Sequence, residues 1–205
     1  MVERGHADRM YACTTGIGEI DTRAELSTTA LEPGDRILVS GTIGEHGTAI
    51  MLARGEFELT SDIESDTRSL WPAVDALLGA AGPGLRCLRD ATRGGVASVL
   101  NELARASKVA MVVREGQVPV NPVVAGAAEI LGIDPMYVAN EGKLVAFVAP
   151  ELADDALAAM RVHDERAAEI GEVRTEPPGM VLVETSFGGR RVMDQLVGDP
   201  LPRIC

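Results

Sequence analysis

The apolar residues of this 205-residue chain fall into two patterns, short continuous runs and longer stretches with helical spacing. Short runs rich in Val, Ile, Leu and Ala that end at Gly, Pro or charged residues are typical of buried strands. They predict strands at 36–40, 85–89, 108–114, 143–149, 168–173, 180–184 and 190–193. The last two runs flank a turn at 186–189, so we expect them to form a hairpin.

Helical spacing is clearest over 96–104, where Val96, Val99, Leu100, Leu103 and Ala104 follow the i, i+3, i+4, i+7, i+8 pattern. Further helices are predicted at 70–78, at 122–131, after Pro150, and over the apolar run at 49–53. Single strands and helices are mixed along the chain. We therefore expect an α+β fold with α/β layering, in which helices cover a mixed sheet.

The two ends of the sequence read differently from its middle. Residues 9–18 predict a strand that runs into a glycine turn. Before Cys205, Pro200 and Pro202 disfavour a helix and favour extended backbone. This segment predicts a short arm that carries a thiol at its tip, and the alternative is an incidental cysteine on a frayed terminus.

Composition narrows the function classes. The net charge of −12 argues against a nonspecific nucleic-acid binder and against binding to an anionic membrane surface. The three cysteines lack metal-site spacing, so we expect no metal site and free thiols in a reducing compartment. Cys13 and Cys87 fall in predicted strands and are expected to be buried. No apolar run is long enough to span a membrane, and the expected location is the cytoplasm.

Two glycine-rich turns precede predicted helices. The turn at 41–47 has Gly-x-x-Gly-x-x-Gly spacing, which matches neither the dinucleotide fingerprint nor the P-loop. The turn at 90–95 reads Asp-Ala-Thr-Arg-Gly-Gly. Either turn could present backbone N–H groups of a helix N-terminus to an anion, and Arg93 could add charge. The alternative for both is a tight turn in which glycines allow close packing.

Glu141 stands between Asn140 and Gly142, so its carboxylate is held on a turn. A carboxylate held in this way is a candidate functional group, and the alternative is an exposed turn residue.

Six segments, in this order, resemble the HypE family, the carbamoyl dehydratases of hydrogenase maturation in the aminoimidazole-ribonucleotide-synthetase-like superfamily. They are residues 3–5, 14–18, 41–47, 90–95, 139–143 and 202–205. The Asp-x-Thr-Arg-Gly-Gly segment and the cysteine-ended tail are the specific parts. One departure is Ala91, where the family usually has proline.

The resemblance also implies a domain organisation. Residues 1–20 would be the residual strand of an absent N-terminal domain and a linker. Residues 21–193 would form the C-terminal α/β domain, and residues 194–205 a flexible tail that ends in the carrier cysteine. The absent domain would hold most of the ATP and Mg²⁺ site and the main homodimer interface, so this chain is expected to be inactive alone.

The family chemistry gives each candidate residue a role. Cys205 would carry a carbamoyl group placed by HypF, and ATP would drive its conversion to a thiocyanate for the HypC–HypD complex. Glu141 would be the base. Phosphate would face the 90–95 turn through Asp90, Thr92, Arg93, Gly94 and Gly95. The alternatives are a non-catalytic module that displays the tail to maturation partners, or another ATP-using member of the superfamily.

Overall fold

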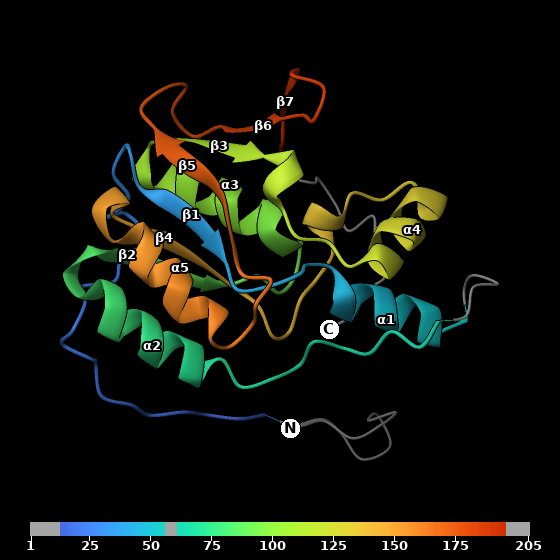
Figure 1. Cartoon of the computed structure of the whole chain (residues 1–205), viewed down its shortest axis with the longest axis horizontal. Helices are drawn as coiled ribbons and strands as arrows, with labels where there is room; N and C mark the ends of the chain where they lie inside the picture. Colours follow the sequence, from blue (N-terminus) through green and yellow to red (C-terminus); the bar gives the residue numbers. More distant parts are fainter. Residues whose placement is uncertain (1–12, 56–60, 196–205) are drawn as a thin grey trace, which may run out of the picture.

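A seven-stranded mixed sheet forms the centre of the computed structural model, which describes residues 13–55 and 61–195 (Figure 1). Its strands are β1 (Arg36–Val39), β2 (Leu85–Asp90), β3 (Ala110–Arg114), β4 (Leu144–Val148), β5 (Ala168–Arg174), β6 (Val181–Glu184) and β7 (Arg190–Val192). They lie in the order β2-β4-β1-β5-β3-β6-β7. The β3–β6 pair is parallel and the other pairs are antiparallel, with β6 and β7 forming the predicted hairpin. The mixed sheet of an α+β fold is thus confirmed.

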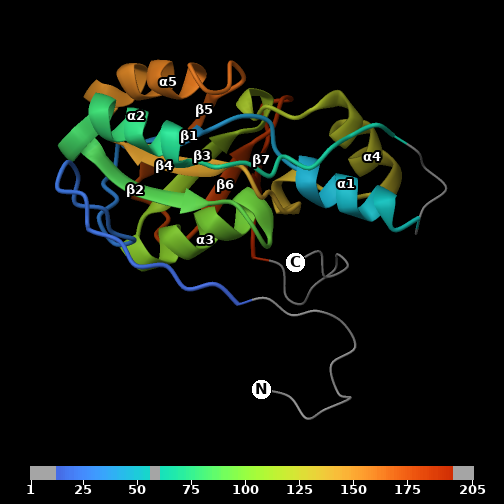
Figure 2. The same ribbon diagram turned by 90° about the horizontal axis from the view of Figure 1, so that it is seen from below.

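Helices lie on both faces of this sheet and beyond one of its ends. They are α1 (Glu45–Ala53), α2 (Trp71–Ala81), α3 (Gly95–Ser107), α4 (Pro122–Leu131) and α5 (Ala153–Arg161), with 3₁₀ turns η1 (Gly82–Gly84), η2 (Glu115–Gln117), η3 (Pro135–Tyr137) and η4 (Pro150–Leu152). Figure 2 shows α3 on one face and α2 with α5 on the other. The pair α1 and α4 lies together beyond one end of the sheet.

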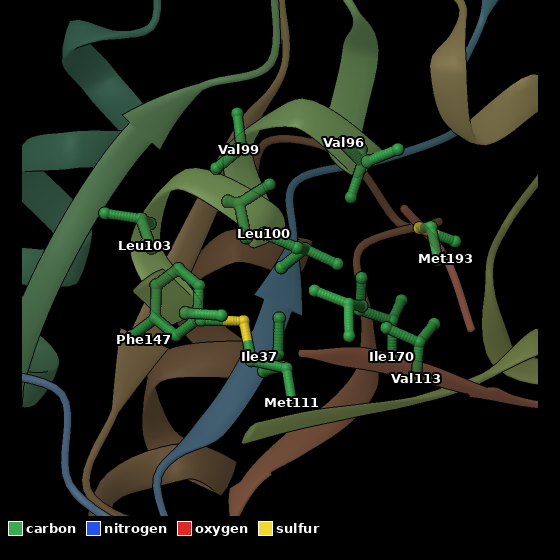
Figure 3. Packing of buried hydrophobic residues seen from close by; sticks show 14 of the residues in the cluster. Ile37, Val96, Val99, Leu100, Leu103, Met111, Val113, Phe147, Ile170 and Met193 are labelled. Atoms are coloured by element: carbon green, nitrogen blue, oxygen red, sulfur yellow. The ribbon is translucent and has the colours of Figure 1, made fainter. Parts of the chain in front are cut away.

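The alternation of side chains along the strands divides the interior into two apolar cores. Ile37 and Val39 of β1 face α3, whereas Leu38 between them faces α2 and α5. In the α3 core, Phe147 and Leu100 are fully buried (Figure 3). Full burial of one such side chain stabilises the folded state by about 1.5–3 kcal/mol. Aliphatic residues fill most of both cores, as the low aromatic content of 3% requires.

The predicted strand before β1 is wrong in its described part. Residues 13–20 have no regular structure and are exposed, including Cys13. Residues 9–12 lie outside the described residues. Within the described chain, no ladder pairs with residues 13–20, and an unpaired segment gains nothing from extended geometry. Farther on, the Ser27 N–H donates to the Arg86 carbonyl at 3.0 Å, so this region runs along the edge strand β2.

The residues that lead from β7 towards the C-terminus are tied to α3 and η3. Asn101 Nδ2 donates to the Met193 carbonyl at 3.0 Å, and the Tyr137 hydroxyl donates to the Asp194 carbonyl at 2.8 Å. Arg105 binds the side chains of Asp194 and Gln195. The predicted tail from residue 196 onwards, with Cys205, lies outside the described residues. No helix in the described ranges is both long and apolar enough to cross a membrane.

The two described cysteines should react at different rates. Cys13 is exposed, whereas Cys87 is buried and its burial raises the pKa of its thiol. Since the thiolate is the reactive form, we expect alkylation of Cys87 to be at least about tenfold slower than that of Cys13 in the folded chain. Peptide mapping after limited labelling measures both rates. Equal rates in folded protein, or faster labelling of Cys87, would contradict the placement of Cys87 in the α3 core.

Candidate functional site

Three turns that are far apart in the sequence meet at the buried side chain of Asn140. Its Oδ1 accepts a hydrogen bond from the Gly44 N–H at 2.8 Å. Its Nδ2 donates to the Ala91 carbonyl at 2.9 Å and to the Val138 carbonyl at 3.1 Å. One amide therefore joins the turns at 41–47, 90–95 and 139–143.

Backbone hydrogen bonds complete this junction. The Asn140 N–H donates to the Ala91 carbonyl at 3.0 Å, and the Ala91 N–H donates to the Lys143 carbonyl at 3.2 Å. Glu141 lies between these two links, so the structure brings the predicted base next to the Asp90–Gly95 turn. A proline at position 91 would have no N–H for the second bond.

The glycines at 41–47 serve close packing rather than an open anion site. A Cβ on Gly44 would lie 2.8 Å from the Val124 side chain, and φ at Gly44 is 84°. The Gly44 N–H is bonded to Asn140, and the Gly47 N–H is bonded to the Ala139 carbonyl at 3.0 Å. The buried carboxylate of Glu45 occupies the first turn of α1. The structure therefore fits the interpretation of residues 41–47 as a tight, closely packed turn rather than as an anion site.

The turn at 90–95 meets packing demands too. The Thr92 hydroxyl donates to Asp90 Oδ2 at 3.0 Å. Gly94 and Gly95 both have positive φ, and a Cβ on Gly95 would lie 2.5 Å from the Met136 carbonyl oxygen. Within residues 13–55 and 61–195, no side chain caps α3, whose N-cap is Gly94. Arg93 is exposed on the turn.

Beneath the Glu141 turn lies a buried group of charged side chains around Lys143, which is 3% exposed. Its Nζ lies 3.2 Å from Glu45 Oε2, 3.7 Å from Asp164 Oδ2 and 3.9 Å from Asp66 Oδ2. Arg68 approaches Asp164 from the surface at 3.3 Å. We refer to Lys143, Glu45, Asp66, Asp164 and Arg68 as the Lys143 cluster.

Two carboxylates of the cluster remain ionised more readily than usual. Burial raises the pKa of Glu45, but the hydrogen bond from Thr42 and the positive charge of Lys143 lower it by more. The net shift of the Glu45 pKa is therefore downward. Burial also raises the pKa of Asp164, and the Arg166 N–H and the Lys143 charge again outweigh it. Within the described ranges, no group of three or more His, Cys, Asp or Glu side chains is arranged to hold a metal ion.

Residues 32–183 match the family model described as AIR synthase related protein, C-terminal domain. The chain belongs to this family. It is homologous to carbamoyl dehydratase HypE of Bradyrhizobium diazoefficiens, with 48% identity over 100% of this chain and 60% of that protein. The chain thus spans about 60% of the length of the curated relative.

Solved structures agree with the assignment to the AIR synthase related family. A crystal structure of hydrogenase maturation protein HypE in complex with ATP superposes with a TM-score of 0.81 at 40% identity, covering 87% of this chain and 55% of that one. A crystal structure of a HypE–HypF complex gives a TM-score of 0.79 at 39% identity, covering 83% and 56%.

Sequence reasoning found the turns of this AIR synthase related domain but missed what holds them together. Asn140, Lys143 and Asp66 were not singled out, because the partners that define them are distant in the sequence. Gly44 bonds to Asn140, Glu45 pairs with Lys143, and Glu141 bonds to Asp66 across 75 residues. A signal was present in Lys143, a lysine at the start of an otherwise apolar strand run. A buried lysine requires carboxylate partners.

The Lys143 cluster predicts that removal of Lys143 destabilises the fold more at pH 7 than at pH 4. The lowered pKa values of Glu45 and Asp164 stabilise the fold above their ordinary values of 4.5 and 3.8, and this stabilisation is lost as the pH falls through the folded-state values. In Lys143→Met, Glu45 and Asp66 lose the cation that faces them, whereas Asp164 keeps its ion pairs with Arg68 and Arg166. We expect a loss of about 3–5 kcal/mol at pH 7, and a smaller loss at pH 4 where protonation removes the unpaired charge.

Urea denaturation of residues 1–205 between pH 3 and pH 8 measures this loss. Arg190→Met is the control, because it removes an exposed ion pair with Glu184 at the protein surface and should change stability by less than about 1 kcal/mol. A loss in Lys143→Met that is equal at pH 4 and pH 7 would show that the cluster is not held by charge.

Proposed function

We propose that this chain is the C-terminal part of an ATP-dependent carbamoyl dehydratase that makes the cyanide ligand precursor in nickel–iron hydrogenase maturation. The observation that carries the proposal is the position of Glu141 beside the Asp90–Gly95 turn. This position is fixed by the hydrogen bonds that Ala91 forms with Asn140 and Lys143, which stand on either side of Glu141 in the sequence. The names of the homologous proteins support the same reaction.

The proposed reaction converts a carbamoyl group on Cys205 to a thiocyanate. The γ-phosphoryl group moves from ATP to the carbamoyl oxygen, and the nitrogen gives up one proton. The carbon–oxygen bond then breaks, the oxygen leaves with inorganic phosphate, and the nitrogen gives up its second proton. The products are the S-cyano group, ADP and phosphate. Glu141 is proposed as the base that accepts a nitrogen proton.

Phosphate recognition is assigned to the 90–95 turn and the N-terminus of α3. The thirteen residues of α3 start at Gly95, and no described side chain caps this end. The Gly95 N–H donates to the Thr92 carbonyl at 2.9 Å, so the anion is assigned to the next N–H groups, those of Val96 and Ala97. Asp90, Thr92 and Arg93 border this end of the helix, and Arg93 would add positive charge. Gly94 and Gly95 also serve packing, so their substitution cannot separate the two roles. Mg²⁺ would be held mainly by carboxylates of the N-terminal part found in longer relatives.

The proposed partners follow from the same proposal. HypF would carbamoylate Cys205, and the HypC–HypD complex would accept the cyano group. A homodimer through the N-terminal part is proposed as well. The solved HypE–HypF complex supports the first partner. In the rival proposal the domain only docks and displays the tail to these partners.

A conservative substitution tests the role of Glu141. The test protein joins residues 1–205 to the preceding part of the Bradyrhizobium diazoefficiens relative, and we call it the joined protein. Glu141→Gln keeps the shape and removes the base, so carbamoylation of Cys205 should persist while conversion to thiocyanate slows by about a hundredfold or more. Mass spectrometry of the C-terminal peptide distinguishes the two adducts.

Glu129→Gln serves as the matched control, because Glu129 is exposed on α4, and it should convert at the unsubstituted rate. Normal conversion by Glu141→Gln would remove Glu141 from the mechanism. Failure of the unsubstituted joined protein to convert carbamoyl-Cys205 with ATP would favour the docking module.

Residues 1–205 alone should fold but turn over no ATP above background. The described residues form two apolar cores, one on each face of the sheet. Phosphoryl transfer, however, depends on metal-assisted positioning that we assign to the N-terminal part. Circular dichroism and a phosphate-release assay measure the two properties, and robust ATP turnover by this chain would contradict the assignment.

A further inference from the structure

The segment at 61–68 packs against the Glu141 turn and binds one backbone group of Glu141 and one of Gly142. Asp66 Oδ1 accepts a hydrogen bond from the Glu141 N–H at 3.0 Å. Arg68 Nε donates to the Gly142 carbonyl at 3.1 Å. One bond holds the N–H of Glu141 and the other holds the carbonyl of the next residue, so together they restrict the orientation of this backbone.

The contact between the segment and the turn is unusually close. A Cβ on Gly142 would lie 1.8 Å from the Asp66 carbonyl oxygen and 2.9 Å from Arg68 Cγ. Only a glycine at position 142 therefore lets the segment reach the N–H of Glu141. His46 Nδ1 and Ser65 Oγ, 2.8 Å apart, hold the same segment to α1.

Asp66 is better buried than a surface loop carboxylate would be. Its side chain is 2% exposed, and its Oδ2 has no hydrogen-bond partner in the described structure. That oxygen faces Lys143 Nζ at 3.9 Å, at the edge of ion-pair distance. Burying a carboxylate with one oxygen unsatisfied costs free energy, so Asp66 sits here at an energetic cost that its bond to Glu141 and the charge of Lys143 offset.

Arg68 links the turn to the rest of the Lys143 cluster. Besides Gly142, it donates to the Ser40 carbonyl and to Asp164 Oδ2, both at 3.3 Å. Asp164 in turn faces Lys143. Arg68 thus ties the Glu141 turn to Ser40 and Asp164, in two other parts of the chain.

The Glu141 carboxylate, unlike the Glu141 backbone, is not held by other residues of the described structure. The side chain is half-buried, and across residues 13–55 and 61–195 its carboxylate forms no hydrogen bond or ion pair. The backbone at 141–142 is held at two groups, the Glu141 N–H and the Gly142 carbonyl, while the Glu141 carboxylate stays available. A general base needs this combination of a fixed position and an unengaged acceptor.

We propose that Asp66 and Arg68 are positioning residues for Glu141. They touch neither the thiocarbamate nor ATP, and they act by holding the backbone at 141–142 so that the Glu141 carboxylate meets the nitrogen proton. This inference rests on the proposed function, because it assigns a purpose to Asp66 and Arg68 only if Glu141 is the base. Small displacements of a catalytic group can slow a reaction by about a hundredfold.

A double-mutant cycle in the joined protein tests the proposal. In Asp66→Ala, we expect the conversion of carbamoyl-Cys205 at saturating ATP to slow by about ten- to hundredfold. The ATP concentration for half-maximal rate should stay unchanged, since Asp66 does not meet the nucleotide. In the Glu141→Gln background, Asp66→Ala should slow conversion no further, because the base through which Asp66 acts is already gone.

Asp66→Asn and Arg68→Met keep the test valid if Asp66→Ala unfolds. Asparagine retains an acceptor for the Glu141 N–H, so Asp66→Asn should slow conversion less than alanine does. Arg68 is exposed enough that its loss should leave the fold intact, and Arg68→Met should slow conversion without changing the half-maximal ATP concentration. Glu64→Ala is the matched control, since Glu64 is an exposed carboxylate of the same segment.

The outcomes separate the two proposals. Equal slowing by Asp66→Ala in the unsubstituted and Glu141→Gln backgrounds would overturn the positioning role and leave Glu141 as the base. Unchanged conversion in folded Asp66→Asn and Arg68→Met would overturn it as well. Unchanged conversion in Glu141→Gln alone would instead remove Glu141 from the mechanism, and the positioning role with it. Failure of the unsubstituted joined protein to convert carbamoyl-Cys205 with ATP would overturn the proposed function itself.

Discussion

The arrangement of the candidate site depends on one buried amide, that of Asn140. Its three hydrogen bonds join a helix N-terminus, the loop after β2 and its own turn. A buried amide left without partners costs about 1–3 kcal/mol. The three turns must therefore approach in one geometry for the amide to be satisfied, and this geometry puts Glu141 beside the Asp90–Gly95 turn.

Charge makes a second, independent demand on the same region. Lys143 cannot be buried without anions, and Glu45, Asp66 and Asp164 supply them from three distant segments. Asn140 and Lys143 flank Glu141 and Gly142, so both ends of the short turn are anchored in the interior. Between the anchors, Asp66 and Arg68 cover the backbone and bind it.

Most of the fold could be predicted from the sequence because its signals are local. The spacing over 96–104 gives α3, and the short apolar runs give the seven strands, including the hairpin of β6 and β7. The segment at 13–18 failed because a strand pattern forms a strand only beside a partner. The proposed domain boundaries and the role of Cys205 remain predictions.

The candidate site was predictable in part. Glycine spacing located the turns, but glycines look the same in sequence whether they admit a ligand or a neighbouring backbone. At 41–47 the structure shows packing against Val124 and a bond to Asn140. The pairing of Asp66 with Glu141 spans 75 residues and depends on the fold, so no local pattern announces it.

The central structural claim is that the turns at 41–47, 90–95 and 139–143 form one unit held by Asn140. Amide hydrogen exchange of residues 1–205 tests it most directly, with Asn140→Asp as a nearly isosteric variant that loses the Nδ2 donor. We expect the N–H groups of Gly44, Ala91 and Glu141 to be protected to a similar degree and to lose protection together in the variant, while the Leu100 N–H of α3 changes less. Loss of protection at only one turn, or unequal protection of the three before substitution, would contradict the claim.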